Sequence, residues 1–310
     1  MTQTHPGFAR MTRLPFLSSI LSPLIAGTLL AVLVGGAFDV VNFVVVLAMG
    51  VALHIATNVY NDIYDTLQGT DRINVHRNEF SGGSGVLVDR PDLLPVMYRI
   101  ARLALLAALV AAAVLAMRVD ASLRIHVIVL YALSAFFSKY YTAAPVKLAY
   151  RGWGEVSVCF AFGPMAILIA TVSQNVGFHP AVIAAMPMTG ISTLSILLVG
   201  QMIDRDADRD TGKWGIAVRA GRKSAALLYA AVQLLLCVNI IVLSLVVPGS
   251  GWPILLALLP CLLLLPRIIP ALLRGHDDMS VLKPVAGRNV QLHLLFSVAL
   301  SVGLGVALLL

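Results

Sequence analysis

The sequence predicts an all-α, polytopic membrane protein, and three observations support this fold class. Of its 310 residues, 59% are hydrophobic and only 12% are charged, whereas soluble domains carry about 25% charged residues. The mean hydropathy is +0.91. The apolar stretches are continuous rather than alternating, which indicates membrane helices and not the strands of a β-barrel.

Nine apolar stretches are long enough to cross a bilayer, at about 20 residues each. The first exceeds the core of a secretory signal and further spans follow it, so we expect it to be retained. The eighth contains Pro253, Pro260, Pro266 and Pro270, which membrane helices tolerate. The expected spans are 14–35, 41–64, 95–117, 124–141, 155–173, 181–203, 224–247, 252–273 and 289–310. They predict one domain, 1–310, built as a single nine-helix bundle.

The basic residues predict the orientation. With nine spans, all but two of the 22 Lys and Arg residues fall on one face, the exceptions being Arg118 and Arg124. The positive-inside rule puts that face in the cytoplasm, with the N-terminus inside. We expect a multi-pass protein of the cell membrane. The net charge of +7 follows from topology and from attraction to anionic headgroups, so it does not indicate nucleic-acid binding.

The first acidic segment, "NVYNDIYDTLQGTD", begins at Asn58, where the second expected span reaches the cytoplasmic face. Residues three or four apart share a helix face. We therefore expect Asn58, Asp62 and Asp65 to point together into the bundle, with Asp71 in the loop that follows.

The second segment, "DRDADRDTGK", begins at Asp204, at the end of the sixth expected span. By the same spacing Asp204 and Asp208 share a face, with Gln201 one turn earlier. The intervening acids fall off that face and are expected to be solvated or paired with neighbouring arginines. These are Asp206 and Asp210, next to Arg205 and Arg209.

Carboxylates at a membrane helix end need a physical reason, because each costs up to about 3 kcal/mol toward the bilayer centre. A single acid there is best explained as solvated or paired with an arginine. Five acids on two helix ends, each set on one face, indicate binding of a hard cation instead. Mg²⁺ is held by carboxylates together with substrate phosphates. Two such sets predict a Mg²⁺-dependent clamp on a diphosphate, active at the cytoplasmic face.

Four segments resemble the UbiA superfamily of intramembrane prenyltransferases, and within it the 1,4-dihydroxy-2-naphthoate branch of the menaquinone pathway. They are "NVYNDIYDTLQGTD", "GGSGVLVDR", "YTAAPVKLAYRGWGEV" and "DRDADRDTGKWGIAVRAG". The resemblance spans roughly 15–225. It implies nine helices and two Asp-rich motifs, and Mg²⁺-dependent transfer of a polyprenyl group from a prenyl diphosphate to an aromatic acceptor. It further implies that the acceptor loses its carboxylate.

The resemblance also implies roles for individual residues. Asn58, Asp62, Asp65, Asp204 and Asp208 would bind Mg²⁺, and the four acids among them would be catalytic. Asn58 would also bind the substrate diphosphate. The other implied diphosphate-binding residues are Arg72, Lys147, Arg151 and Lys213.

Tyr141 lies where the family places residues near the reacting centre, although an interfacial aromatic is an equal alternative. The loops at 66–94 and 205–223 would cap the site. Gly82, Gly83 and Gly85 would supply hinges or simply a flexible linker.

Several alternatives remain open. A membrane transporter would place its ion and substrate sites near the bilayer midplane, whereas these acids lie at helix ends. A lipid alcohol phosphotransferase would carry a "DGxxAR" pattern, which the sequence lacks. Within the family, the acceptor could be another aromatic or quinone precursor. His54 could line the cavity, but packing is the more common role of such a histidine; His126 and His293 are weaker candidates, and Glu155 is expected to serve the start of the fifth helix.

Overall fold

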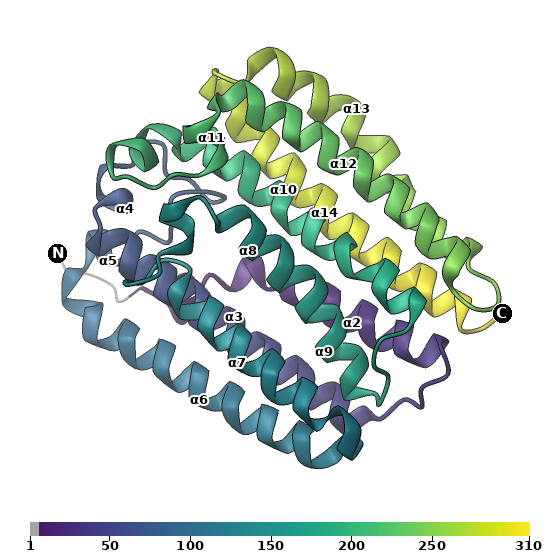
Figure 1. Ribbon diagram of the computed structural model, residues 1–310. Helices are drawn as coiled ribbons and strands as arrows, with labels where there is room; N and C mark the ends of the chain where they lie inside the picture. The colour runs from purple at the N-terminus through teal and green to yellow at the C-terminus, as the bar shows by residue number, and fades with distance from the viewer. Residues whose placement is uncertain (1–5) are drawn as a thin grey trace.

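The computed structural model describes residues 6–310, in which nine helical segments are long and apolar enough to span a membrane. Within them the α-helices are α2 (Ser18–Leu33), α3 (Val40–Leu67), α6 (Leu94–Arg118), α7 (Arg124–Tyr140), α8 (Gly154–Phe160) with α9 (Ala166–Ser173), α10 (Pro180–Asp210), α12 (Gly221–Val246), α13 (Leu258–Gly275) and α14 (Met279–Ala307). They run up and down as one bundle (Figure 1). The predicted all-α membrane fold is therefore confirmed, and the chain is an integral, multi-pass membrane protein.

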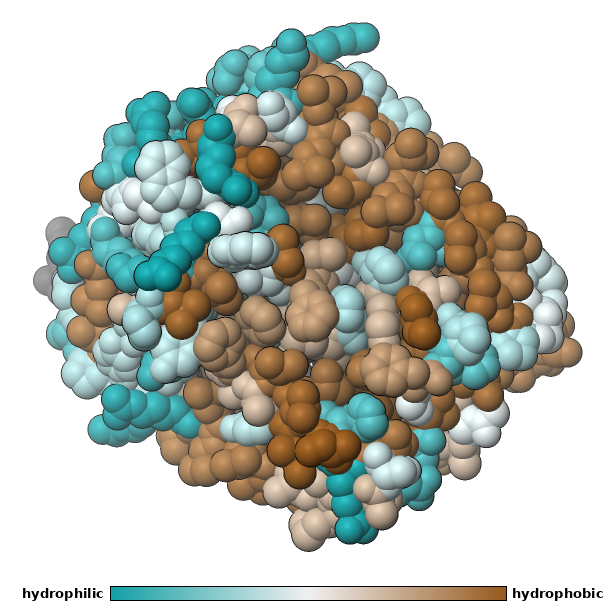
Figure 2. All heavy atoms as spheres, viewed as in Figure 1, coloured by the Kyte–Doolittle hydropathy of each residue, from teal (hydrophilic) through white to brown (hydrophobic). Residues whose placement is uncertain are grey.

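Short helices mark one end of the bundle, which we call the polar end. They are α1 (Phe8–Thr12), α4 (Thr70–Ile73), α5 (Val86–Asp89) and α11 (Ile216–Arg219). Hydrophilic atoms gather over this end, whereas the flanks of the long helices are largely hydrophobic (Figure 2). This distribution suits helix flanks in lipid and a polar end in water.

Two helices, α10 and α14, extend well beyond the predicted spans. The predicted sixth span ends at 203, but α10 continues through the acidic motif to Asp210. The connection to α12 is therefore much shorter than the predicted loop 205–223. The predicted ninth span starts at 289, but α14 starts at Met279, where Asp278 caps it by accepting a 2.8 Å hydrogen bond from the Ser280 N–H. Charged residues lower the hydropathy at both places without interrupting the helix.

The helix α10 lies at the centre of the bundle. It packs against α2, α8, α9, α12 and α14, and its apolar stretch is 72% buried, against 17% for that of α7. A glycine allows α10 to cross close to α8, because a Cβ on Gly190 would collide with the carbonyl oxygen of Cys159. The apolar stretch of α10 is thus held in the protein interior, whereas α7 is largely left to lipid.

The fifth span is interrupted by a π-helical turn, Ala161–Met165, between α8 and α9. Pro164 lies in this turn and has no N–H to donate. Thr189 of α10 donates a 2.7 Å hydrogen bond to the Phe162 carbonyl oxygen within this turn. Such turns are tolerated where a neighbouring helix satisfies the backbone. This one forms part of a cavity wall.

Candidate active site

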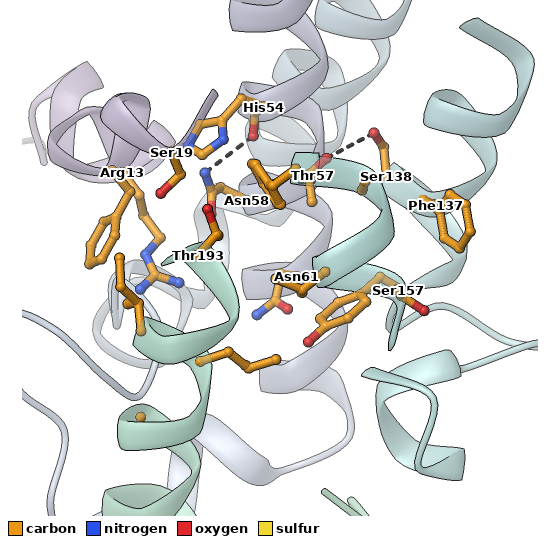
Figure 3. Close-up of a pocket in the computed structure, with 18 of the residues that line it drawn as sticks. Arg13, Ser19, His54, Thr57, Asn58, Asn61, Phe137, Ser138, Ser157 and Thr193 are labelled. Atoms are coloured by element: carbon orange, nitrogen blue, oxygen red, sulfur yellow. Dashed lines mark hydrogen bonds between the residues drawn. The ribbon is translucent and has the colours of Figure 1, made fainter. Parts of the chain in front are cut away.

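A cavity of about 260 Å³ opens between the helices at the polar end. Residues from α2, α3, α7, α8, α9 and α10 line it, together with the connection after α4 (Figure 3). Its deeper part is apolar and includes Leu24, Met49, Phe137, Ile169 and Leu197. Acidic and amide side chains from both motifs line the other part. The cavity therefore suits an amphiphile with a charged head and an apolar body.

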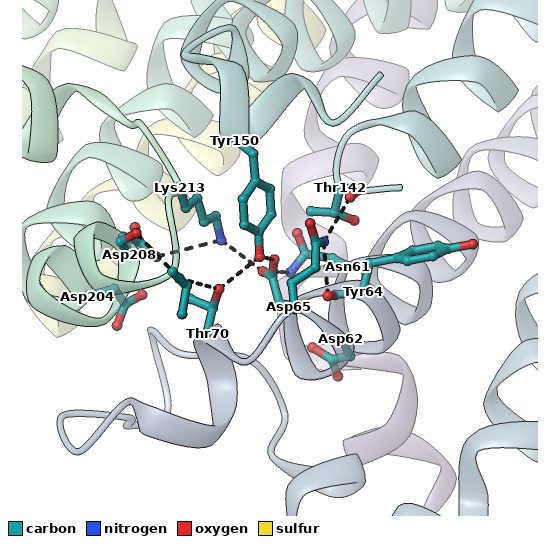
Figure 4. A network of polar contacts seen from close by, with 12 residues as sticks. Asn61, Asp62, Tyr64, Asp65, Thr70, Thr142, Tyr150, Asp204, Asp208 and Lys213 are labelled. Atoms are coloured by element: carbon teal, nitrogen blue, oxygen red, sulfur yellow. Dashed lines mark hydrogen bonds and ion pairs between the residues drawn. The ribbon is translucent and has the colours of Figure 1, made fainter. Parts of the chain in front are cut away.

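Asp65 on α3 is the most thoroughly bonded acid of the site. It is buried, and its Oδ2 accepts hydrogen bonds of 2.8 Å from both Asn61 Nδ2 and Lys213 Nζ (Figure 4). Its Oδ1 accepts a 2.8 Å bond from the hydroxyl of Tyr150, which also contacts the Thr70 hydroxyl at 2.8 Å. These bonds fix the orientation of the carboxylate, and the lysine bond is strengthened by charge.

The acids of α10 form the facing wall. Gln201, Asp204 and Asp208 all line the cavity. Asp204 Oδ1 accepts a 2.7 Å hydrogen bond from Asn74 Nδ2. Asp208 Oδ1 is buried without a hydrogen bond, and Lys213 Nζ lies 3.9 Å away. Lys213 therefore stands between the two walls and interacts with an acid from each.

The remaining acids of α10 point away from the cavity. Asp206 forms ion pairs with Arg222 at 2.9 Å, Arg205 at 3.6 Å and Arg209 at 3.8 Å. Asp210 pairs with Arg209 at 3.1 Å. Arg222 extends the expected pairing with Arg205 and Arg209. These charges face the exterior and are balanced locally.

Asp62 does not line the cavity with its neighbours. It is buried, and both carboxylate oxygens accept long bonds from the Ser84 backbone N–H, at 3.2 and 3.3 Å. Because consecutive helical residues point about 100° apart, Asn61 and Asp62 point in clearly different directions. Asn58 and Asp65 point in directions between those two. The cavity takes in Asn58, Asn61 and Asp65, so Asp62 faces the connection instead.

Asp71 reaches the same cavity from α4. Its Oδ2 has no hydrogen bond. Gly83 packs directly against the carboxylate, where a Cβ would collide with it. Burial, reinforced by the charges of Asp65 and Asp62, raises the pKa of Asp71 to about 9. Asp71 is therefore a candidate cation ligand supplied by a loop.

The neighbouring acids change the pKa values of Lys213 and Tyr150. Burial alone would lower the pKa of Lys213, but the Asp65 and Asp208 carboxylates raise it well above its usual value. Burial raises the pKa of Tyr150, and the Asp65 carboxylate adds to the effect. The lysine is thus a permanent cation at the polar end of the cavity, and Tyr150 is a neutral hydrogen-bond donor.

The other basic residues that were predicted to bind the diphosphate lie outside the cavity lining. Arg72 is exposed, and Arg151 is exposed and bonds the carbonyl of a nearby turn at 3.0 Å. Lys147 stacks its ammonium over the Tyr150 ring at 5.6 Å. Tyr141 does line the cavity, beside the acids. Of the four basic residues that we assigned to the diphosphate, Lys213 alone reaches the cavity.

Sequence reasoning missed several residues of the site, namely Arg13, Asn61, Asn74 and Tyr150. Arg13 has a left-handed backbone (φ 53°) between α1 and the first span, which brings its guanidinium to the cavity wall, 4.7 Å from the Phe16 ring centroid. Asn61 stands in the first motif, where its 60° offset from Asn58 hid its role. Tyr150 carried a signal in "AYRGWGE", but nothing local to it specifies a partner 85 residues earlier.

The segment before α8 holds the loop that carries Lys213. The Tyr150 carbonyl accepts a 3.3 Å hydrogen bond from the Trp214 N–H. Glu155 Oε1 accepts a 2.6 Å bond from the Ile216 N–H at the start of α11. Glu155 is thus at the start of α8, as expected, and it also anchors the loop. These bonds set where Lys213 can reach.

The donor set fits a hard divalent cation. Three residues that line the cavity each carry a buried oxygen without a hydrogen-bond partner: Asp71 Oδ2, Asp208 Oδ1 and Gln201 Oε1. Mg²⁺ prefers such oxygen ligands and completes its shell with phosphate and water. The described residues contain no group of three or more His, Cys, Asp or Glu side chains that could hold a metal by itself.

Comparisons with known proteins agree with this fold. The UbiA prenyltransferase family matches residues 20–281. The chain is 28% identical to the 2-carboxy-1,4-naphthoquinone phytyltransferase of Arabidopsis thaliana, over 96% of this chain and 76% of the relative. It is 30% identical to the 1,4-dihydroxy-2-naphthoate octaprenyltransferase of Mycobacterium tuberculosis, over 65% and 66%. A UbiA homolog from Archaeoglobus fulgidus, bound to DMAPP and Mg²⁺, shares the fold with a TM-score of 0.58 and 14% identity, over 96% and 100%.

The fold and the cavity define a membrane-embedded enzyme whose site joins a charged end to an apolar chamber. The chain belongs to the UbiA prenyltransferase family, and it is a prenyltransferase.

Proposed function

We propose that this protein transfers a polyprenyl group from a prenyl diphosphate to 1,4-dihydroxy-2-naphthoate in a Mg²⁺-dependent reaction of menaquinone biosynthesis. One observation carries the proposal. Acids from α3, α4 and α10 face one another across the polar end of a cavity, Lys213 lies between them, and the rest of the cavity is apolar. This arrangement matches an anionic head joined to a hydrocarbon tail.

The cavity residues divide the work of holding the head group. Asn58, Asp65, Asp71, Asp204 and Asp208 would hold Mg²⁺, with Asp62 available if the connection around Ser84 withdraws. When bound, Mg²⁺ supplies positive charge that stabilises the departing diphosphate.

Cationic side chains complete the binding of the head group. Lys213 and Arg13 would bind diphosphate oxygens that the metal leaves free. Because both cations reach the cavity from outside the spans, they place positive charge where negative charge develops as the carbon–oxygen bond breaks. Tyr150 and Glu155 hold Asp65 and the Lys213 loop in position for this role.

The deeper cavity would protect the reacting carbon. Loss of diphosphate leaves an allylic cation, which water would quench, and the apolar wall excludes water. Aromatic faces attract cations, and Tyr141 stands on the lining beside the acids, so we assign it to the cation. The aromatic ring then forms a carbon–carbon bond to the prenyl carbon and loses its carboxylate as CO₂, so that no oxidant is required.

Two further observations support the choice of acceptor and side. Relatives named for naphthoate and naphthoquinone substrates match along the chain, and the segment "AYRGWGEV" places Tyr150 and Glu155 around the site. The polar end carries the short helices and the basic connections, so we place it in the cytoplasm by the positive-inside rule. The enzyme would then take its diphosphate from the cytoplasmic side of the cell membrane.

The proposal is tested with membranes that contain the protein, one labelled prenyl diphosphate and a panel of aromatic acceptors. We expect prenylated, decarboxylated product from 1,4-dihydroxy-2-naphthoate, and its loss when a chelator removes Mg²⁺. Product from another acceptor alone would correct the substrate. Uptake of label into sealed vesicles without any product would instead indicate a transporter.

A further inference from the structure

A second group of polar side chains lies in the cavity, on the apolar side of the acids. His54 of α3 lines the cavity and is 5% exposed, yet neither ring nitrogen has a hydrogen bond. Its ring meets the edge of Phe162 at 5.9 Å between centroids. A buried imidazole without hydrogen-bond partners costs free energy. Packing alone does not explain why the chain has a histidine at this position.

Helices α10 and α2 each contribute a hydroxyl group to the cavity wall. Thr193 of α10 lines the cavity and is 7% exposed, and its hydroxyl oxygen has no partner. Ser19 of α2 also lines the cavity, and Figure 3 shows it with His54 among the lining residues. Three helices therefore contribute polar side chains to the cavity wall. A hydrocarbon tail offers none of these groups a hydrogen bond.

The position of His54 along α3 determines how far it lies from the first acidic motif. Asn58 follows it by one turn and donates a 3.2 Å hydrogen bond to its carbonyl oxygen. One turn of α-helix is about 5.4 Å long and each residue adds about 1.5 Å, so His54 lies roughly 5.4 Å along the axis from Asn58 and about 16 Å from Asp65, the acid of α3 that lines the cavity. A group held at His54 would therefore lie beyond Asn58, on the apolar side of the acids.

Another buried histidine of the chain shows the usual arrangement. His293 of α14 is 1% exposed, and its Nδ1 forms a 2.9 Å hydrogen bond with the Ser192 hydroxyl. It therefore has a protein partner, and it does not line the cavity. His54 differs on both counts, because it lines the cavity and neither of its buried ring nitrogens has a protein partner.

We infer that His54 and Thr193 form the acceptor subsite, where they hydrogen-bond the oxygen substituents of the aromatic ring. A neutral imidazole offers one donor and one acceptor, and a threonine hydroxyl offers both. A ring that carries hydroxyl and carboxylate oxygens satisfies these groups, while its edge packs beside Phe162. His54 and Thr193 thus determine which acceptor enters. This inference rests on the proposed prenyl transfer.

The test uses the full chain in nanodiscs, with His54→Phe, Thr193→Val and a matched control. His54→Phe keeps an aromatic ring and removes both nitrogens. His126→Phe is the control, because His126 of α7 makes a similar edge contact with Phe178, at 6.0 Å, outside the cavity lining. Two quantities are measured for each variant: equilibrium binding of 1,4-dihydroxy-2-naphthoate without prenyl diphosphate, and the KM for each substrate during turnover.

We expect His54→Phe to weaken acceptor binding and to raise the acceptor KM by about tenfold, which corresponds to about 1.4 kcal/mol. The KM for prenyl diphosphate should stay within about twofold, because the acids that grip it are untouched. Thr193→Val, a change of similar shape, should weaken acceptor binding by about threefold as one neutral hydrogen bond is lost. His126→Phe should change neither quantity.

Selectivity gives an independent readout. The wild type should prefer 1,4-dihydroxy-2-naphthoate to 1-hydroxy-2-naphthoate, and His54→Phe should narrow that preference. His54→Gln, which restores a donor and an acceptor, should recover part of it. Unchanged acceptor binding in His54→Phe and Thr193→Val, in an active enzyme, would overturn the acceptor subsite alone. A wild type inactive with every acceptor would overturn the proposed function instead.

Discussion

The two ends of the bundle handle their charges in opposite ways. At the polar end, acids are buried and several oxygens lack partners, including Asp71 Oδ2 and Asp208 Oδ1. At the other end, Asp39 accepts a 2.9 Å hydrogen bond from the Asn42 N–H and pairs with Arg118 at 3.0 Å. Arg118 also donates a 2.6 Å bond to Asn42 Oδ1.

The difference indicates that one end binds ligands and the other stabilises the bundle. The network of Asp39, Asn42 and Arg118 joins α3 to α6 with its hydrogen bonds made within the protein, so it stabilises the bundle and needs no ligand. The polar end has buried side-chain groups that could still bind cations and anions, and leaving such groups without hydrogen bonds costs free energy. An evolved protein retains such a cost where a ligand removes it. Substitutions at the two ends should therefore differ in kind.

The largest effect is expected from Asp208→Asn. This change keeps the size of the side chain and removes a negative charge from the α10 wall. Prenyl transfer should fall by about 100-fold or more, as when a preorganised electrostatic group is removed from an active site. Rates are measured at saturating Mg²⁺ in membranes that contain equal amounts of protein.

Asp210→Asn is the matched control for that change. Asp210 belongs to the same helix and motif but is paired with Arg209 at 3.1 Å outside the cavity. It should retain nearly full activity. Equal losses in the two variants would show that the motif acts through charge or folding in general and not through the cavity.

A smaller loss is expected from Lys213→Gln, which removes the cation shared by the two walls. The bond to Asp65 and the interaction with the diphosphate are charge-assisted, and losing about 2 kcal/mol lowers kcat/KM for prenyl diphosphate by roughly 30-fold. The exposed Lys223→Gln on α12 serves as control. If kcat/KM is unaffected in Lys213→Gln, Arg13 carries the diphosphate without it.

Tyr150→Phe should have a modest effect. It deletes the hydroxyl that donates to Asp65 Oδ1 and leaves the ring and its backbone bond to Trp214. A neutral hydrogen bond contributes about 1 kcal/mol, so we expect about fivefold lower kcat/KM. Tyr140→Phe is the comparison, since the Tyr140 ring packs on Phe136 at 5.1 Å outside the cavity lining. A loss in both would point to helix packing.

The smallest effect is expected at the opposite end, from Asp39→Asn. Its pair with Arg118 is exposed, so unfolding should become easier by less than about 1 kcal/mol, while prenyl transfer is unchanged. The Asn42 N–H bond, with help from Arg118, holds the pKa of Asp39 below 3.8. Its contribution is therefore present above pH 3.8 and disappears as the pH falls through the lower folded value.

Thermal unfolding in detergent, measured across pH, checks this expectation. The Tm difference between wild type and Asp39→Asn should be constant above about pH 5 and vanish in stronger acid. A loss of prenyl transfer in this variant would contradict the division between the two ends.

The sequence was informative about spans and poor about helix ends. Hydropathy located nine spans because a bilayer demands long apolar runs. It placed the end of the sixth too early, because it senses the water boundary, and α10 continues past that boundary to Asp210. The same limit placed the start of α14 late.

Helical spacing was informative about α10 and less so about α3. Asp204 and Asp208 line the cavity with Gln201, as their spacing implies. On α3 the same rule grouped Asp62 with Asn58 and Asp65, but the cavity takes in Asn61 instead. Spacing defines which residues share a face, and only neighbouring helices decide which edge of that face is used.

By itself, then, the sequence determined the membrane fold, the two acidic motifs and the polar end where they meet, because hydropathy and helical period are local properties. The tertiary structure alone decided the rest of the site. It placed Tyr150 and Lys213 on Asp65, brought Arg13 from the chain's start, and left His54 facing the cavity. These contacts join residues far apart in the chain, and their geometry depends on how whole helices pack, which no local pattern encodes.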